Sequence, residues 1–286
     1  MRPPPPGVKT AMPPRTIYIA FGSHQVALTS DAPEVLAGVE SMYAAMVAPA
    51  ATRVAGRLEV SRNGGPYDIR GNTVELEDGS LADILRCLRF SVIQVLIQVR
   101  PDLLWLHAGA VASGGRAMLL PGEPGRGKST LASSLCARGW TYLSDEVVPL
   151  IPASSRAVPF PLTPARREFP GQEMPSDWLR APNKVEVPLP PERLCREPVP
   201  VGALVFPSYK VGAPAELSPC PPAHAVVELL RHSWNFASHQ GGAVRYLCDL
   251  AARVPAVHLS FGDGELAAEL LTRSRVMVET NHTLAS

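Results

Sequence analysis

The chain has 286 residues, of which 46% are apolar and 19% are charged, so its composition is that of a globular protein. It carries 27 basic and 26 acidic residues, and the resulting charge of +1 argues against general binding to nucleic acid or to a membrane surface. Its five cysteines are scattered and form no C-x-x-C pair, which argues against a disulfide framework or a zinc site and fits a reducing, cytoplasmic location.

The N-terminal 100 residues are predicted to form an arm followed by a small α+β module. Residues 1–14 are rich in proline and lack the apolar core of a signal peptide, so we expect a flexible arm. Residues 15–100 combine strand-like and helical patterns and show no constellation of catalytic side chains. Strands are expected at 16–21, 25–28 and 53–60, two short strands around a Gly71-Asn72 turn are expected within 67–76, and a helix is expected at 31–46.

Two apolar segments lead into the second part of the chain. The pattern at 81–99 predicts a long helix that starts near Asp78 or Ser80 and ends before a proline, and it is too interrupted by arginine to predict a membrane span. The segment 103–112 indicates a buried strand that contains His107. A single histidine on an apolar strand is usually a core residue, so His107 needs further support before it is assigned a function.

Residues 116–139, RAMLLPGEPGRGKSTLASSLCARG, carry the clearest chemical signal. A short apolar strand precedes a turn of the form G-x-x-x-x-G-K-S, and a helix follows. Such turns direct backbone N–H groups and a helix N-terminus at phosphate oxygens, so the sequence predicts a site for the phosphates of a nucleotide. The simpler interpretation is a glycine-rich connection from strand to helix. The predicted phosphate-binding residues are Gly122, Glu123, Pro124, Gly125, Arg126, Gly127, Lys128, Ser129 and Thr130.

Two acidic residues, Asp145 and Glu146, lie within the next apolar segment, residues 140–150. If this strand runs parallel to the strand before the loop, both strands end at the same edge of the sheet. A carboxylate that binds Mg²⁺ is expected at that edge, with the Ser129 hydroxyl as a further ligand. The alternative is a solvated strand end, because acidic residues are common there.

Residues 101–286 are predicted to form one α/β domain. Residues 151–180 are rich in proline and are predicted to form a long loop. The remaining strands are expected at 184–189, 203–207 and 256–261, and the remaining helices at 222–234, 242–254 and 264–271.

The order of these parts resembles the catalytic domain of HPr kinase/phosphorylase, and more closely the shorter HPr-kinase-related proteins. His107 lies 15 residues before Gly122, as the family histidine lies before its phosphate loop. The loop GEPGRGKS is followed by a helix, and residues 143–147 (LSDEV) match the acidic pair after an apolar strand. The likeness is clear over 103–148 and weaker from there to the C-terminus.

The resemblance implies a P-loop kinase domain with a mixed sheet, of the type shared with ATP-dependent phosphoenolpyruvate carboxykinases. The implied chemistry is Mg²⁺-dependent transfer of the γ-phosphoryl group of ATP to a serine of a protein or peptide. Asp145 is then the base that takes the serine proton, and His107 orients the phosphate or the acidic pair. Lys128 holds the phosphates.

The same resemblance implies a set of Mg²⁺ ligands and a source of positive charge for the transition state. The implied Mg²⁺ ligands are Ser129, Asp145 and Glu146. The candidates for the positive charge are Arg126, Arg166 and Lys184.

Three departures from the family pattern bear on the substrate. The second acidic residue is Glu146 rather than aspartate, the signature of true HPr kinases after the loop region is not recognisable, and the N-terminal module is different. HPr itself is therefore not the expected acceptor. A nucleotide-binding regulatory protein with weak or no transfer activity and a small-molecule kinase stay open as alternatives. Homo-oligomerisation and the role of Asn235 stay open as well.

Overall fold

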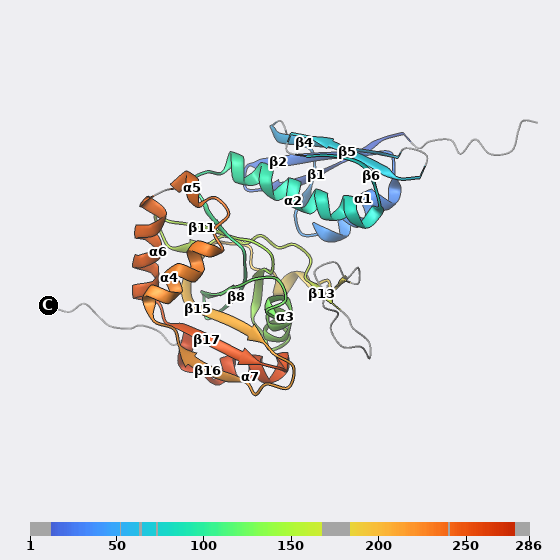
Figure 1. Ribbon diagram of the computed structural model, residues 1–286. Coiled ribbons are helices and arrows are strands. Elements are labelled where there is room, and N and C mark those ends of the chain that lie inside the picture. Colours follow the sequence, from blue (N-terminus) through green and yellow to red (C-terminus); the bar gives the residue numbers. More distant parts are fainter. Residues whose placement is uncertain are drawn as a thin grey trace, which may run out of the picture. The chain divides into compact units, whose positions relative to one another are not determined.

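The computed structural model describes residues 13–51, 53–62, 65–72, 74–167, 184–239 and 241–277. The chain divides into two compact units, Met1–Val99 and Arg100–Ser286, which are described separately below (Figure 1). Most of the predicted arm, residues 1–12, and part of the predicted long loop, residues 168–180, lie outside the described residues.

The first unit is built on a six-stranded mixed sheet with the order β3-β1-β2-β4-β5-β6. Strands β1 and β2 form an antiparallel hairpin, β2 pairs with β4 in parallel, and β4, β5 and β6 follow as an antiparallel meander. The predicted strands are confirmed, and the short β3 was not predicted. The strands are β1 (Arg15–Phe21), β2 (His24–Ser30), β3 (Val47–Ala48), β4 (Val54–Arg62), β5 (Tyr67–Gly71) and β6 (Glu75–Gly79).

Two helices, α1 (Pro33–Met42) and α2 (Leu81–Val99), pack together in this unit (Figure 1). Helix α2 has the predicted bounds, because Ser80 and Asp83 exchange side-chain bonds with each other's backbone N–H groups at its first turn. Helix α1 ends four residues earlier than predicted, since the chain turns at Tyr43 to enter β3.

The second unit contains a nine-stranded mixed sheet and a separate two-stranded sheet of β13 and β14. Strand β15 lies in the centre and pairs in parallel with both β9 and β17, whereas β8 pairs with β9 and β10 in antiparallel fashion. The strands are β7 (Leu104–Leu106), β8 (Ala108–Ser113), β9 (Arg116–Pro121), β10 (Thr141–Ser144), β11 (Val148–Ile151), β12 (Arg156–Ala157), β13 (Ala165–Arg167), β14 (Lys184–Glu186), β15 (Val199–Tyr209), β16 (Glu216–Pro219) and β17 (Ala256–Phe261).

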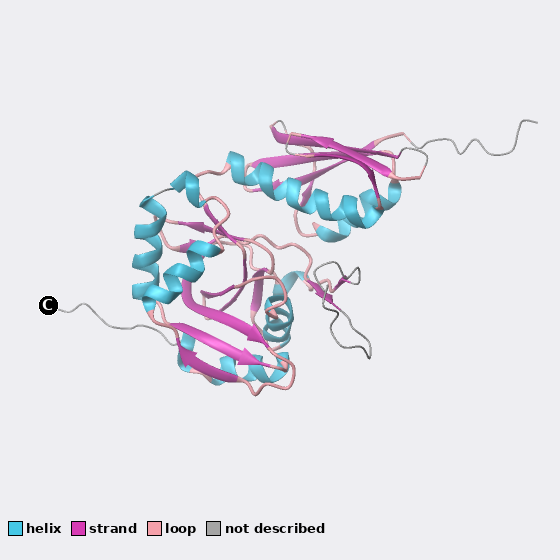
Figure 2. Ribbon diagram, viewed as in Figure 1, coloured by secondary structure: helices cyan, strands magenta, loops and turns pink. Residues whose placement is uncertain are grey.

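Helices cover both faces of this sheet (Figure 2). Helices α3 and α7 pack on one face, and α4 and α6 pack on the other. The helices are α3 (Lys128–Ala137), α4 (Pro222–Arg231), α5 (Phe236–His239), α6 (Gly241–Arg253) and α7 (Gly264–Arg273), with 3₁₀ turns η2 (Pro191–Arg193) and η3 (Arg275–Met277).

Strand β9 has an uninterrupted apolar sequence because both of its faces are buried. Met118 and Leu120 lie in the core beneath α3 and α7, whereas Ala117 and Leu119 lie in the core beneath α4 and α6. Successive side chains of a strand point to opposite faces, and here both faces are buried. The mixed α/β architecture of this unit agrees with the predicted fold class.

The predicted single strand at 103–112 is wrong in one respect, because the chain breaks at His107 into β7 and β8. The His107 N–H donates to the His232 carbonyl at 2.7 Å instead of to a neighbouring strand. The same contact region ends the predicted helix 222–234 early. Helix α4 stops at Arg231, Ser233 forms a bridge to Leu106, and the Trp234 N–H donates to the backbone of β7.

In the predicted segment 140–150, strand β10 ends directly before the acidic residues, as expected, and a tight turn at 145–147 leads into β11, which was not predicted as a separate strand. The Ser144 hydroxyl accepts the N–H groups of Glu146 and Val147, which stabilises this turn. Strand β15 is longer than the predicted 203–207, and β12, β13 and β16 were not predicted.

Candidate active site

The predicted phosphate loop is a strand-loop-helix unit in the structure. Strand β9 ends at Pro121, and α3 begins at Lys128 with its N-terminus at the loop. Gly125 and Gly127 both have φ of +88°, in the left-handed region that favours glycine. The loop therefore has the backbone conformation for which its glycines are suited, and the positive end of the α3 dipole lies beside it.

Replacing Gly127 with alanine is expected to lower the free energy of unfolding by about 2–4 kcal/mol, from left-handed strain and overpacking together. An alanine Cβ there would lie 2.6 Å from Cζ of Phe261 and 3.3 Å from Cβ of Tyr209. Gly114→Ala is the matched control, because Gly114 has φ of +57° and no atom within 4 Å of the added Cβ. The control is expected to lose about 1 kcal/mol. Urea unfolding measures both variants, and equal losses would contradict the packing argument.

Lys128 is buried, with 6% of its surface exposed, and its ammonium group lies at the start of the loop. Its Nζ donates to the carbonyl oxygens of Gly122 at 2.6 Å and Glu123 at 3.0 Å, and lies 3.2 Å from Nε2 of His107. A buried ammonium group has three N–H donors that each need an acceptor, and the two carbonyl oxygens and the imidazole nitrogen supply them. Lys128 therefore lies at the start of the loop, and its binding of phosphate stays a prediction.

His107 links Lys128 to the acidic pair. Its Nδ1 lies 2.9 Å from the Glu146 carbonyl oxygen, which only accepts, so the proton is on Nδ1 and the Nε2 lone pair faces Lys128. The imidazole also stacks on Trp234, with ring centroids 5.7 Å apart and an angle of 10° between the planes. Burial, followed by the charge of Lys128, lowers the pKa of His107 to about 4. His107 is thus a neutral hydrogen-bond acceptor at pH 7.

Asp145 and Glu146 lie at the same edge of the sheet as the loop. Strand β10 is antiparallel to β8, and β8 is antiparallel to β9, so β10 and β9 run in the same direction. The strand before the acidic pair therefore runs parallel to the strand before the loop, as a shared sheet edge requires. Asp145 is buried, with 6% exposed, and its Oδ1 lies 2.8 Å from the hydroxyl of Tyr142, which also contacts the Leu162 carbonyl at 3.0 Å. Tyr142 was not identified from the sequence.

The predicted Mg²⁺ ligands are all hard oxygen donors, the class that Mg²⁺ prefers. Ser129 is half-buried in the first turn of α3, Asp145 is buried, and Glu146 is half-buried. Within the described residues, no group of three or more His, Cys, Asp and Glu side chains is placed to hold a metal ion. This donor set fits a Mg²⁺ ion that is bound by one or two carboxylates together with substrate phosphates, rather than a closed protein cage.

A pocket of about 530 Å³ opens beside the first residues of the loop. It is lined by loop residues 121–123 and Arg126, by the end of β15 at residues 206–208, by Glu228 and Arg231 of α4 with His232 directly after it, and by His258 of β17. His232 is buried, and its pKa is lowered by burial and then by the charge of Lys128. The α4 residues were not predicted. Their i, i+3, i+4 spacing places them on one helix face, but only the tertiary structure brings that face to the loop.

The other predicted residues lie on α3, in the loop and on the two-stranded sheet, and Arg126 is one of the residues that line the pocket. Thr130 is exposed on α3, and the exposed Arg126 pairs weakly with Glu123 at 3.8 Å. Arg166 lies on β13 and Lys184 on β14, which form the separate two-stranded sheet, and their side chains are outside the description.

Asn235 has a structural role. Its Oδ1 accepts the Trp105 N–H at 3.0 Å, and its Nδ2 donates to the Leu103 carbonyl at 2.8 Å. The side chain is buried, and these two hydrogen bonds anchor the segment after α4 to the backbone at strand β7.

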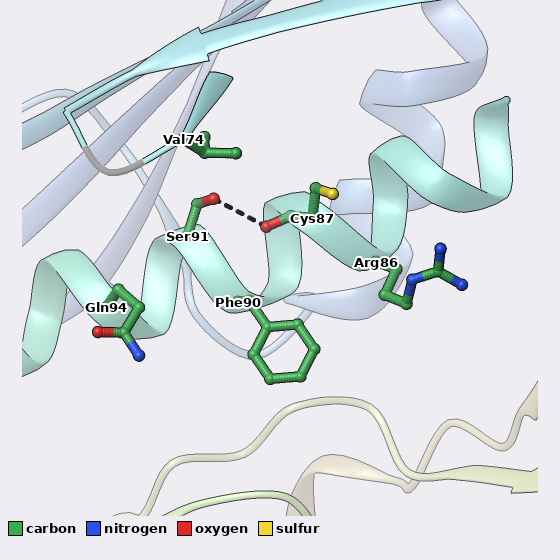
Figure 3. A pocket seen from close by; sticks show the side chains of 6 residues that line it. All are labelled: Val74, Arg86, Cys87, Phe90, Ser91 and Gln94. Atoms are coloured by element: carbon green, nitrogen blue, oxygen red, sulfur yellow. Dashed lines mark hydrogen bonds between the residues drawn. The ribbon is translucent and has the colours of Figure 1, made fainter. Parts of the chain in front are cut away.

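A smaller hollow of about 220 Å³ lies in the first unit, against one side of α2 (Figure 3). Arg86 and Phe90 project from the helix there, while the Ser91 hydroxyl donates back to the Cys87 carbonyl at 2.8 Å. Arg86 is already paired with Asp83. This hollow brings no set of catalytic side chains together, so the candidate active site is the loop region of the second unit.

Comparison with known proteins gives a distant structural similarity only. No protein-family model matches the chain, and no curated protein matches it. Among solved structures, it is similar to the Hpr(Ser) kinase/phosphatase from Coxiella burnetii, with a TM-score of 0.30 and 13% identity, over 59% of this chain and 91% of that chain. Among the described helices, none combines the length and apolar character needed to cross a membrane.

Proposed function

We propose that the chain is an ATP- and Mg²⁺-dependent phosphotransferase that transfers the γ-phosphoryl group to a serine hydroxyl of a protein or peptide. The observation that carries this proposal is the buried Lys128 ammonium at the start of a glycine-rich loop, linked through His107 to an acidic turn at the same sheet edge. A fold of the HPr kinase and phosphoenolpyruvate carboxykinase type is part of the proposal, supported by the order of strand, loop, helix and acidic strand end.

The loop amides and Lys128 bind the phosphates in this mechanism. Phosphate oxygens offer Lys128 charged acceptors in place of the two loop carbonyls, and charge-assisted bonds are the stronger ones. His107, which is neutral and fixed by Glu146 and Trp234, positions the lysine ammonium rather than competing with it for negative charge. His107 is therefore a positioning residue.

Asp145 is the proposed base. The acceptor oxygen forms a bond to the γ-phosphorus, the bond between that phosphorus and the β,γ-bridging oxygen breaks, and ADP leaves. The acceptor proton passes to the Asp145 carboxylate, whose orientation is held by the Tyr142 hydroxyl. Mg²⁺, held by Ser129, Asp145 and Glu146, would neutralise charge on the phosphate oxygens.

A small-molecule kinase is the second candidate, and the pocket beside the loop favours it. Its volume of about 530 Å³ is within the range of sites that enclose a small ligand, about 300–1,000 Å³. A regulatory protein that binds nucleotide without transfer is the third candidate, and the buried placement of both Lys128 and Asp145 favours an enzyme over it.

Removal of the metal ion tests the proposal directly. With EDTA, transfer from [γ-³²P]ATP to acceptor is expected to stop, and added Mg²⁺ is expected to restore it. Glu146→Gln is expected to raise the Mg²⁺ concentration for half-maximal rate by about tenfold, because a carboxylate ligand becomes a neutral amide. Glu216→Gln, an exposed residue of β16, is the matched control. Transfer that persists in EDTA would contradict the metal-dependent mechanism.

A further inference from the structure

The pocket beside the loop lies at the end of the site where the transferred phosphate belongs. Lysines of phosphate loops reach the β- and γ-phosphates. The Lys128 ammonium contacts the carbonyls of Gly122 and Glu123, so the terminal phosphate lies near these two residues. Both residues also line the pocket. The pocket therefore opens toward the γ-phosphate, where an acceptor must enter.

The charged side chains around the pocket are balanced in sign. Arg126 pairs with Glu123 at 3.8 Å, and Arg231 pairs with Glu228 at 3.0 Å. Three of these four side chains are roughly half exposed or more, and exposed pairs contribute little to stability, so a bound molecule can replace them at small cost. His232, the buried member of this wall, has its pKa lowered and is neutral at pH 7.

Two positive and two negative groups favour a ligand that carries both signs. A purely anionic ligand would face Glu123 and Glu228, and a purely cationic one would face the arginines. A serine in the middle of a peptide carries no charge on its own amide groups and would leave both pairs unused. An acceptor with an ammonium and a carboxylate satisfies both, since guanidinium groups bind carboxylates well. Phe206 and Pro207 supply the apolar part of the lining.

We infer that this pocket is the acceptor subsite and that it takes a free hydroxy amino acid, with Glu228 receiving the ammonium group and Arg231 the carboxylate. This inference rests on the proposed phosphotransferase activity and replaces its protein or peptide acceptor with a free amino acid, which is the small-molecule alternative. It makes Glu228 and Arg231 specificity-determining residues and gives α4 a role in substrate selection.

The test is calorimetric titration of L-serine, L-threonine and L-homoserine into the full chain saturated with Mg²⁺ and a non-hydrolysable ATP analogue. At least one of them is expected to bind at least about tenfold more tightly than N-acetyl-L-serinamide, which has the hydroxyl group but neither charge. Glu228→Gln and Arg231→Gln are each expected to weaken that binding by about tenfold. Arg273→Gln, which breaks the comparable Glu269–Arg273 pair of α7, is the matched control.

Two outcomes overturn the inference. One is that none of the three amino acids binds, or that the capped compound binds equally well. The other is that Glu228→Gln or Arg231→Gln weakens binding of the ATP analogue instead of binding of the amino acid. That result would assign the pocket to the nucleotide. The proposed function is tested separately by label transfer from [γ-³²P]ATP. Transfer to a capped serine peptide alone overturns the inference and leaves the function, whereas amino acid binding without any transfer overturns the function.

Discussion

Replacing Lys128 with methionine is expected to reduce phosphoryl transfer by about 100-fold or more and to weaken nucleotide binding by about tenfold. Methionine fills a similar volume but removes the only ammonium that contacts the Gly122 and Glu123 carbonyls and His107 in the described structure. Loss of a positive charge aimed at a transferring phosphoryl group raises the barrier more than it weakens ground-state binding. Single-turnover transfer and titration with an ATP analogue measure the two effects.

The control for this prediction is Arg245→Met, which removes an exposed cation of α6. Urea unfolding of the Lys128 variant checks that two uncapped loop carbonyls have not unfolded the protein. If they have, Lys128→Arg serves as the second variant, since it keeps the charge but places a planar fork where a compact ammonium fits. A Lys128 variant that is folded and transfers phosphate at the wild-type rate would remove the loop from the mechanism.

Asp145→Asn is expected to reduce transfer by about 10²- to 10⁴-fold, the usual contribution of a general base, while nucleotide affinity changes little. Asparagine has nearly the same shape and keeps an oxygen to accept the Tyr142 hydroxyl, so the turn after β10 is expected to stay intact. Because the amide cannot take the acceptor proton, the loss belongs to the chemical step. The rate of a single turnover and the dissociation constant of the ATP analogue separate the chemical step from binding.

Asp249→Asn is the matched substitution at an exposed aspartate of α6, and it is expected to leave both quantities unchanged. Tyr142→Phe gives an intermediate test, because it keeps the base and removes the hydroxyl that orients it. An Asp145 variant that loses nucleotide binding in proportion to rate would exclude the role of base and leave Asp145 only as a Mg²⁺ ligand or a structural residue.

The parts predicted well from the sequence are those with local signals. Helix α2 begins at a serine with a reciprocal partner three residues later and ends before a proline, so both of its ends are set by neighbouring residues. The loop of residues 122–127 is specified by its own glycines. Strand β17 was also predicted with its observed bounds, because it is a short apolar run between a proline and a glycine.

The parts that were missed depend on contacts between distant segments. The break at His107 exists because the carbonyl of His232 accepts its N–H, across 125 positions of sequence. Tyr142 is indistinguishable from any core aromatic residue until its hydroxyl is seen at Asp145. Likewise, the polar face of α4 has the pattern of a solvated helix surface, and the backbone contacts of residues 232–234 with residues 105–107 bring it to the loop. Local patterns contain none of this information.

The most direct test of the central claim is the stoichiometry of transfer from [γ-³²P]ATP with Mg²⁺, measured with the free hydroxy amino acids and with serine-containing peptides. The account predicts one labelled phosphate ester on a hydroxyl for each ADP formed, and loss of both products in Lys128→Met and Asp145→Asn. Binding of ATP with no labelled acceptor, and with the same slow hydrolysis in wild type and in both variants, would contradict it.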